Sequence, residues 1–114
     1  MDLDGKISLV TGAGQGIGEG IAKVLAAHGS KVVLVDLNGD AAKKVSDQIN
    51  SNIPDAAISF QANLTDETAI AAMIEFAHEK YNRLDCICNN AAASKGIGPV
   101  EDYALQDVKA TLDL

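Results

Sequence analysis

The residues best suited to chemistry form a glycine-rich segment followed by one acid. Residues 11–18 read TGAGQGIG and lie between an apolar run and an amphipathic stretch. Glycines at such a turn let a pyrophosphate approach main-chain N–H groups, and the helix N-terminus beyond adds partial positive charge. Asp36 ends the next apolar run, where a carboxylate can accept hydrogen bonds from ribose hydroxyls. Together these features favour a dinucleotide site over a tight turn and a capping aspartate. No Gly-Lys-Ser/Thr follows, which excludes a P-loop.

The same acid indicates which dinucleotide is preferred. Asp36 would repel the 2′-phosphate of NADP, since like charges in contact oppose binding. Gln15, Leu37 and Asn38 stand where an arginine or lysine would otherwise hold that phosphate. The sequence therefore predicts NAD as the cofactor.

Two other groups of residues could in principle do chemistry, and both are better explained without it. Cys86 and Cys88 are two apart in an apolar run, so they share one face of a strand. A metal would need further ligands, and neither His28 nor His78 has a ligand-like spacing to the pair. A disulfide would also suit same-strand thiols poorly, so we expect core cysteines. Ser94 has no base spaced to activate it and is predicted to be a loop hydroxyl.

These residues must be positioned by alternating strands and helices. Apolar runs predict strands at 7–10, 31–36, 57–62 and 84–89. Helical spacing predicts three helices between them and one more at 105–114, after a loop at 91–99. Thr65 is the expected N-cap of the third helix, and Gly29 the left-handed residue that ends the first. The predicted apolar helix faces are Ile17, Ile21, Val24, Leu25 and His28; Ala41, Val45 and Ile49; and Ile70, Met73, Ile74 and Ala77.

Strands that alternate with helices indicate a parallel sheet with right-handed crossovers. The expected fold is a doubly wound α/β parallel sheet (Rossmann-like) with strand order 3-2-1-4. At 114 residues, the chain has the length of one domain, so we expect residues 1–114 to form a single dinucleotide-binding domain.

Composition excludes several other classes of protein. Hydrophobic residues make up 47% and charged residues 22%, which is typical of a globular chain. A net charge of -7 argues against binding nucleic acid or an anionic membrane surface. No apolar run is long enough to span a bilayer, and the acidic N-terminus does not resemble a secretory signal. With only two cysteines, a reducing, cytoplasmic location is predicted.

Three motifs together resemble the short-chain dehydrogenase/reductase family, and the likeness extends along the whole chain. The segment Thr11-Gly12-x-x-x-Gly16-Ile17-Gly18 is similar to the cofactor loop of that family. Asn89-Asn90-Ala91-Ala92 is similar to its Asn-Asn-Ala-Gly motif, with Ala92 in place of glycine. Asn63-Leu64 resembles its Asp-Val/Leu pair, with Asn63 in place of the commoner aspartate.

The resemblance implies a set of cofactor-binding residues. Gly12, Gly16 and Gly18 would shape the turn that carries Gln15, and the region of Ile17 would face the pyrophosphate or nicotinamide end. Asp36 would hold the adenosine ribose, while Asn63 and Leu64 would flank the adenine. Asn90 and its neighbour would line the adjoining ribose. The full expected set is Gly12, Gln15, Gly16, Ile17, Gly18, Asp36, Asn63, Leu64, Asn90 and Ala91.

The family resemblance also implies an activity that this chain alone would lack. Members transfer a hydride between the nicotinamide and an alcohol or ketone, with a Tyr-x-x-x-Lys pair as acid/base. Here Tyr81 is followed by Asp85 and Tyr103 by Asp107, so neither fits. We therefore expect the N-terminal, NAD-binding half of such an oxidoreductase, truncated before the catalytic segment and inactive alone.

Two alternatives stay open, and one expectation concerns assembly. The chain could instead be a non-catalytic nucleotide-binding or assembly module. A methyltransferase using S-adenosylmethionine also has a glycine loop and an acid, but the Asn-Asn-Ala segment disfavours it. The fourth strand would be an unblunted sheet edge, so a homo-oligomer is predicted.

Overall fold

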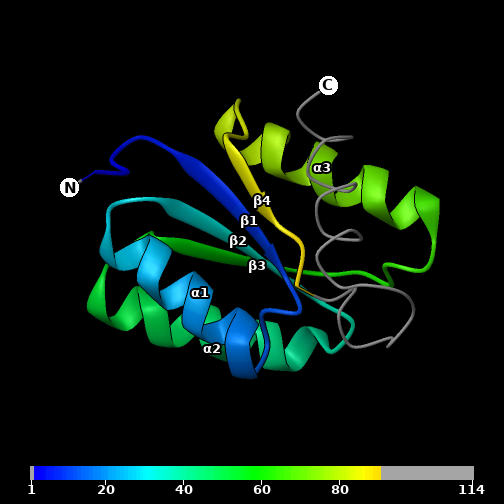
Figure 1. Ribbon diagram of the computed structural model, residues 1–114, viewed down its shortest axis with the longest axis horizontal. Helices are drawn as coiled ribbons and strands as arrows, with labels where there is room; N and C mark the ends of the chain where they lie inside the picture. The colour runs from blue at the N-terminus through cyan, green and yellow to red at the C-terminus, as the bar shows by residue number, and fades with distance from the viewer. Residues whose placement is uncertain (1, 91–114) are drawn as a thin grey trace.

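A four-stranded parallel sheet forms the centre of the computed structural model, which describes residues 2–90 (Figure 1). The strand order is β3-β2-β1-β4, as predicted from the sequence. The elements in chain order are β1 (Ile7–Thr11), α1 (Gly16–Ala27), β2 (Lys31–Asp36), α2 (Gly39–Asn52), β3 (Ala57–Gln61), α3 (Glu67–Tyr81) and β4 (Cys86–Cys88). The predicted loop at 91–99, the helix at 105–114 and Ser94 lie outside the described residues.

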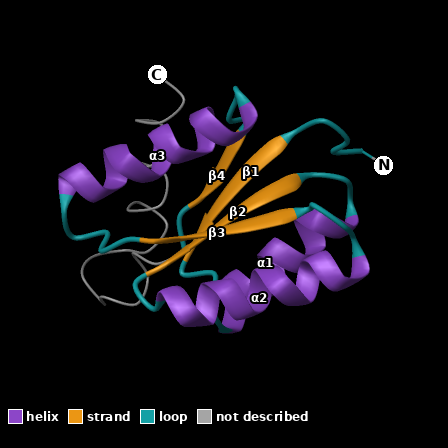
Figure 2. Cartoon of the chain, turned by 180° about the vertical axis from the view of Figure 1, so that it is seen from behind, coloured by secondary structure: helices purple, strands orange, loops and turns teal. Residues whose placement is uncertain are grey.

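Helices cover both faces of the sheet, α1 and α2 on one face and α3 on the other (Figure 2). Alternate strand residues supply the two cores, because successive side chains of a strand point to opposite faces. Val10 and Leu34 are buried in the core under α1 and α2. Leu9 and Val33 are buried in the core under α3. The strands are nearly continuous apolar runs for this reason: each is covered on both sides.

The buried face of α1 differs from the predicted one. Ile17 and Val24 are 75% and 57% exposed, whereas the buried residues of α1 are Gly18, Ala22 and Ala26. Small side chains let the helix axis lie close to the sheet, so the contact line follows alanine and glycine rather than the largest apolar residues. Of the other members of the predicted face, Ile21 and Leu25 do pack against the core, and His28 is exposed.

The helix ends agree only in part with the sequence prediction. Gly29 follows α1 with φ +100°, the left-handed conformation expected there. Thr65 is not the N-cap of α3, so that prediction is wrong. Asp66 takes this place, and its side chain accepts a hydrogen bond of 2.9 Å from the Thr68 N–H. The Thr65 hydroxyl instead donates to Asn63 Oδ1 over 2.7 Å.

β4 is shorter than predicted, with three residues rather than the six of 84–89. Before the strand, Asp85 and Ile7 are joined by two hydrogen bonds: the Asp85 N–H donates to the Ile7 carbonyl oxygen over 2.9 Å, and the Asp85 carboxylate accepts from the Ile7 N–H over 2.8 Å. Cys86 is exposed and Cys88 is half-buried, so the prediction that both are core residues is wrong for Cys86. Within the described residues, β4 pairs with β1 alone, and Cys86 has no helix over it comparable to α1 over β1 and β2.

In residues 2–90, the longest apolar helical stretch falls short of what a bilayer crossing requires.

Candidate functional site

The predicted cofactor residues come from four connections that follow the four strands. In a parallel sheet the carboxyl ends of all strands lie at one edge, and open α/β sheets bind their ligands there. Figure 1 shows β1, β2 and β3 running in the same direction toward that edge. The glycine loop follows β1, Asp36 ends β2, Asn63 and Leu64 follow β3, and Asn90 follows β4.

The glycine loop has the backbone shape that its sequence predicts. Gly12 and Gly16 have φ values of +63° and +61°, which favour glycine over other residues. Gly18 is constrained by space instead, because a Cβ there would collide with the carbonyl oxygen of Gly12. α1 begins at Gly16, and the preceding Gln15 makes no side-chain cap hydrogen bond. The N–H groups of the first turn therefore remain available for an anionic ligand.

Asp36 lies against this loop. Its Oδ2 accepts a hydrogen bond of 2.8 Å from the Gly14 N–H, and its Oδ1 accepts one of 2.9 Å from the Asn38 N–H. Gly14 must lack a side chain here, since a Cβ would lie 2.9 Å from Asp36 Oδ2 and 2.8 Å from Ala41 Cβ. The acid and the loop, eighteen or more residues apart in sequence, are thus one unit, with a half-buried carboxylate at its rim.

The end of β4 is tied to the other side of the loop. Asn90 Nδ2 is 3.4 Å from the carbonyl oxygen of Gly12, to which it donates. The hydroxyl of the buried Thr11 donates over 2.9 Å to Asn89 Oδ1. Both residues lie in motifs identified from the sequence, but no hydrogen bond between them was predicted. Their position at the ends of two strands that pair could have suggested one.

Asn63 and Leu64 have more local surroundings. Asn63 is exposed, and its Oδ1 accepts from the N–H and the hydroxyl of Thr65 over 3.1 and 2.7 Å. Leu64 is half-buried and packs against the core under α3. The structure therefore places both residues at the edge where the strands end, without a hydrogen bond among the described residues to the glycine loop. Ala91 lies outside the described residues.

Two large apolar side chains are exposed beside the loop. Ile17, in the first turn of α1, is 75% exposed, and Leu37, next to Asp36, is 65% exposed. Apolar surface beside a few placed polar groups is typical of small-molecule sites. Leu37 was missed as a site residue, although an apolar residue directly after the acid was a usable signal.

The one tyrosine of the described residues is not part of the candidate site. Tyr81 ends α3, and desolvation, with a further effect from Asp55, raises the pKa of its phenol. α3 runs back toward the amino ends of the strands, which places Tyr81 away from the glycine loop (Figure 2). Asp85, four residues later, is bound to Arg83 and to the Ile7 N–H. Within residues 2–90, no group of three or more histidine, cysteine or acidic side chains is placed to hold a metal ion.

The sequence and the fold both match known proteins. The family model described as short chain dehydrogenase matches residues 6–114. A versicolorin reductase of Emericella nidulans is 48% identical over 90 residues, covering 78% of this chain and 34% of the reductase. A 7alpha-hydroxysteroid dehydrogenase of Escherichia coli is 37% identical over 113 residues, covering 98% of this chain and 43% of the dehydrogenase.

A solved structure with a similar fold is the 3-ketoacyl-(acyl-carrier-protein) reductase of Brucella melitensis complexed with NADH. It is 40% identical, with a TM-score of 0.69, over 75% of this chain and 33% of the reductase. The chain thus spans between a third and a little under half of the length of these relatives.

Proposed function

The chain belongs to the short-chain dehydrogenase family of oxidoreductases, and on that premise we propose that it is the NAD-binding part of an enzyme that interconverts an alcohol and a ketone. In such an enzyme, NAD accepts or supplies the hydride. The described residues contribute the binding and orientation of that cofactor.

The observation that carries the proposal is the contact between Asp36 and the glycine loop. A carboxylate hydrogen bonded to the Gly14 N–H lies at the point where a ribose would meet the loop. It can exchange these N–H donors for ribose hydroxyls, whereas a 2′-phosphate would bring negative charge against it. The glycine loop offers no cation to offset that charge, because residues 11–18 contain no lysine or arginine.

The other residues have roles that follow from their places. The first-turn N–H groups of α1 would receive the pyrophosphate, and the exposed Ile17 would face the pyrophosphate or the nicotinamide end. Asn63 and Leu64 would flank the adenine, on the side of β3. Asn90, held by the Gly12 carbonyl, would line the second ribose together with Ala91.

Calorimetric titration with NAD and NADP tests the cofactor. We expect NAD to bind at least about tenfold more tightly, a difference of about 1.4 kcal/mol. Asp36→Ala should reduce this difference in affinity between NAD and NADP. Asp47→Ala is the matched control, because it removes an equally charged, exposed side chain farther along α2 and should leave the difference unchanged. Equal or tighter binding of NADP by the unaltered chain would contradict the proposal.

Turnover is the second test. The 114-residue chain lacks a Tyr-x-x-x-Lys pair, so we expect it to reduce no NAD with any alcohol above background. Steady turnover by a purified sample would refute this expectation. NAD binding without turnover in any longer form of the protein would favour the alternative, a non-catalytic nucleotide-binding or assembly module.

Two further properties belong to the proposal. We expect a small-molecule substrate, with neither nucleic acid nor a membrane as a partner, and a cytoplasmic location. The net charge of -7 supports the expectation that neither nucleic acid nor a membrane is a partner, because nucleic acids and anionic lipid surfaces attract basic proteins.

A further inference from the structure

The two cysteines of β4 form a close pair. Their sulfur atoms are 3.9 Å apart. Cys88 is paired in register with Val10 and, like it, packs on the side of the sheet that α1 and α2 cover, so Cys86, two residues earlier, faces the same side. Cys86 is exposed and Cys88 half-buried, so a solute can reach the pair from the side of Cys86.

The separation suits a shared metal ion. With metal–thiolate bonds of about 2.3 Å, two sulfurs on one trigonal or tetrahedral ion lie about 3.8–4.0 Å apart. The observed 3.9 Å falls in that interval without movement of the strand. A disulfide fits less well, because its sulfurs are about 2.05 Å apart and its Cα atoms rarely more than about 6.8 Å, the distance two residues of extended strand already span.

Within residues 2–90, the neighbouring groups offer the pair no third protein ligand. Asp85 is adjacent in sequence, but its carboxylate is occupied by Arg83, at 2.6 and 2.9 Å, and by the Ile7 N–H. Over residues 2–90 no third histidine, cysteine or acid joins the cluster. Two thiolates with open remaining positions suit Cu(I), a soft ion, better than zinc, whose structural sites are closed by four protein ligands.

We propose that Cys86 and Cys88 chelate one Cu(I) ion, with a small external thiol or water completing its coordination. On binding, both thiols release their protons to solvent and the ion stays in its monovalent state, so no oxidant or reductant is needed. The proposed metal ligands are not among the proposed nucleotide residues: they are side chains on one face of β4, whereas the nucleotide residues follow the ends of the strands.

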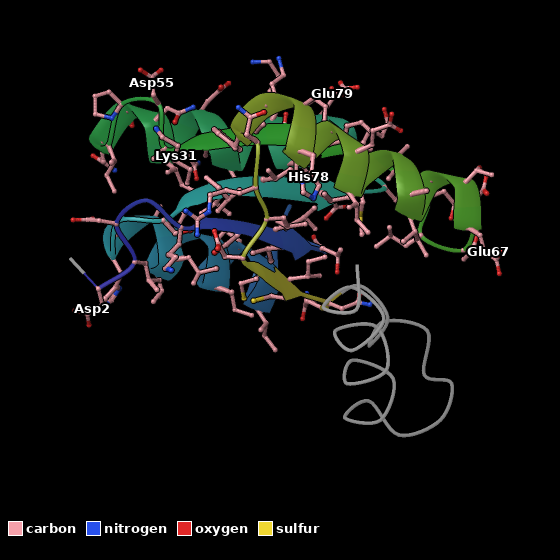
Figure 3. The ribbon with its side chains drawn as sticks, turned by 90° about the horizontal axis from the view of Figure 1, so that it is seen from above. Asp2, Lys31, Asp55, Glu67, His78 and Glu79 are labelled. Atoms are coloured by element: carbon pink, nitrogen blue, oxygen red, sulfur yellow. The ribbon has the colours of Figure 1, made fainter. Side chains whose placement is uncertain are left out.

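Competition with a chromophoric Cu(I) chelator, under anaerobic conditions, tests the pair. The 114-residue chain should withdraw one equivalent of Cu(I). Cys86→Ser and Cys88→Ser should each weaken binding at least about 100-fold, since each leaves one thiolate. His78→Gln is the control and should leave Cu(I) binding unchanged: it removes a potential ligand from α3 (Figure 3), and α3 covers the opposite face of the sheet from α1 and α2 (Figure 2). Single-cysteine variants that bind Cu(I) as tightly as the unaltered chain would overturn the proposal.

A second measurement needs no variant and does not depend on how well one folds. One equivalent of Cu(I) should protect both cysteines of the unaltered chain from alkylation together, as mass spectrometry of the labelled peptides would show. Protection of one cysteine alone, or of neither, would overturn chelation by the pair.

Discussion

Gly18 and Gly20 lie two residues apart in α1 and face very different surroundings. A Cβ at Gly18 would collide with the Gly12 carbonyl and lie 2.9 Å from Asn90 Nδ2, whereas a Cβ at Gly20 would meet nothing within 4 Å. We expect Gly18→Ala to lower the free energy of unfolding by about 1–3 kcal/mol, since the loop must move to admit the methyl group. Gly20→Ala should raise it by about 0.5–1 kcal/mol, because alanine favours the helix.

Urea unfolding of both variants, followed by circular dichroism, measures the difference. The pair controls for helix propensity, since both substitutions exchange glycine for alanine in one helix. A Gly18→Ala variant as stable as Gly20→Ala would show that the loop does not need the close approach to Gly12.

Asp66 and Thr65 make a similar contrast at the level of a helix. Asp66 caps α3 through Thr68, and Thr65 does not. We expect Asp66→Ala to lower the melting temperature more than Thr65→Ala, because only the first leaves an N–H of the first turn without its acceptor. Thermal unfolding at pH 7 compares the two variants. A larger fall in the melting temperature for Thr65→Ala would indicate that Thr65, the residue predicted from the sequence, is the N-cap.

Asp85 connects the start of β4 to β1 through its carboxylate, and we expect this contact to weaken in acid. The guanidinium of Arg83, together with the Ile7 N–H, lowers the pKa of this carboxyl below its usual value. Because this pKa is lower in the folded state, the contribution of the ionised carboxyl to stability is fully present above the unfolded pKa, about 3.9. It is lost as the pH falls through the folded pKa. We expect Asp85→Ala to cost about 1 kcal/mol at pH 7.

The cost of Asp85→Ala should shrink as the pH falls below about 4, because the unaltered carboxyl also becomes neutral. Unfolding by urea at several pH values follows this change. Asp47→Ala is the control: Asp47 is in an exposed pair with Lys43, 2.9 Å apart, and its removal should cost under about 0.5 kcal/mol. A cost for Asp85→Ala that persists unchanged at pH 2 would contradict the role of the charge.

Among the elements, the strands were more predictable than the helix faces. A run such as residues 31–36 is apolar because helices cover both sides of the sheet, and that composition is visible without coordinates. The contact line of α1 was not visible in this way. Hydropathy ranks Ile17 and Val24 above Ala22 and Ala26, but the distance between helix and sheet is set by the smallest residues.

Across the whole molecule, the parallel topology made the location of the candidate site predictable and its internal contacts unpredictable. Motifs after four successive strands had to meet at one edge once the strand order was known. The hydrogen bonds from Gly14 to Asp36 and from Thr11 to Asn89 depend on exact register and rotamers, which residue spacing does not specify.

At the scale of the whole molecule, we predict that the chain associates with other copies of itself. Over the described residues, β4 is paired on one side only, and an unpaired edge can pair with another chain. The exposed Ile17 and Val24 add apolar surface. We expect sedimentation equilibrium to show a dimer or a larger species. Cys86→Lys should favour the monomer, since lysine blunts an edge strand, whereas Ala72→Lys on the exposed side of α3 should not.

A single species of 11.8 kDa at high micromolar concentration would contradict the association of the unaltered chain. An equal effect of the two lysine variants would mean that added charge, rather than the edge of β4, governs association.

The place of β1 between β2 and β4 has a consequence for the order of folding. Ile7 pairs with Lys31, but Ser8 pairs with Cys86, 78 residues later. Closing the longer loop costs about 1 kcal/mol more chain entropy than closing the shorter one. During synthesis, β1 can therefore pair with β2 long before β4 exists, and one side of the earliest strand stays open until the last described strand arrives. Because Asn90 reaches Gly12 only then, a growing chain should form this part of the candidate site only after β4 has paired with β1.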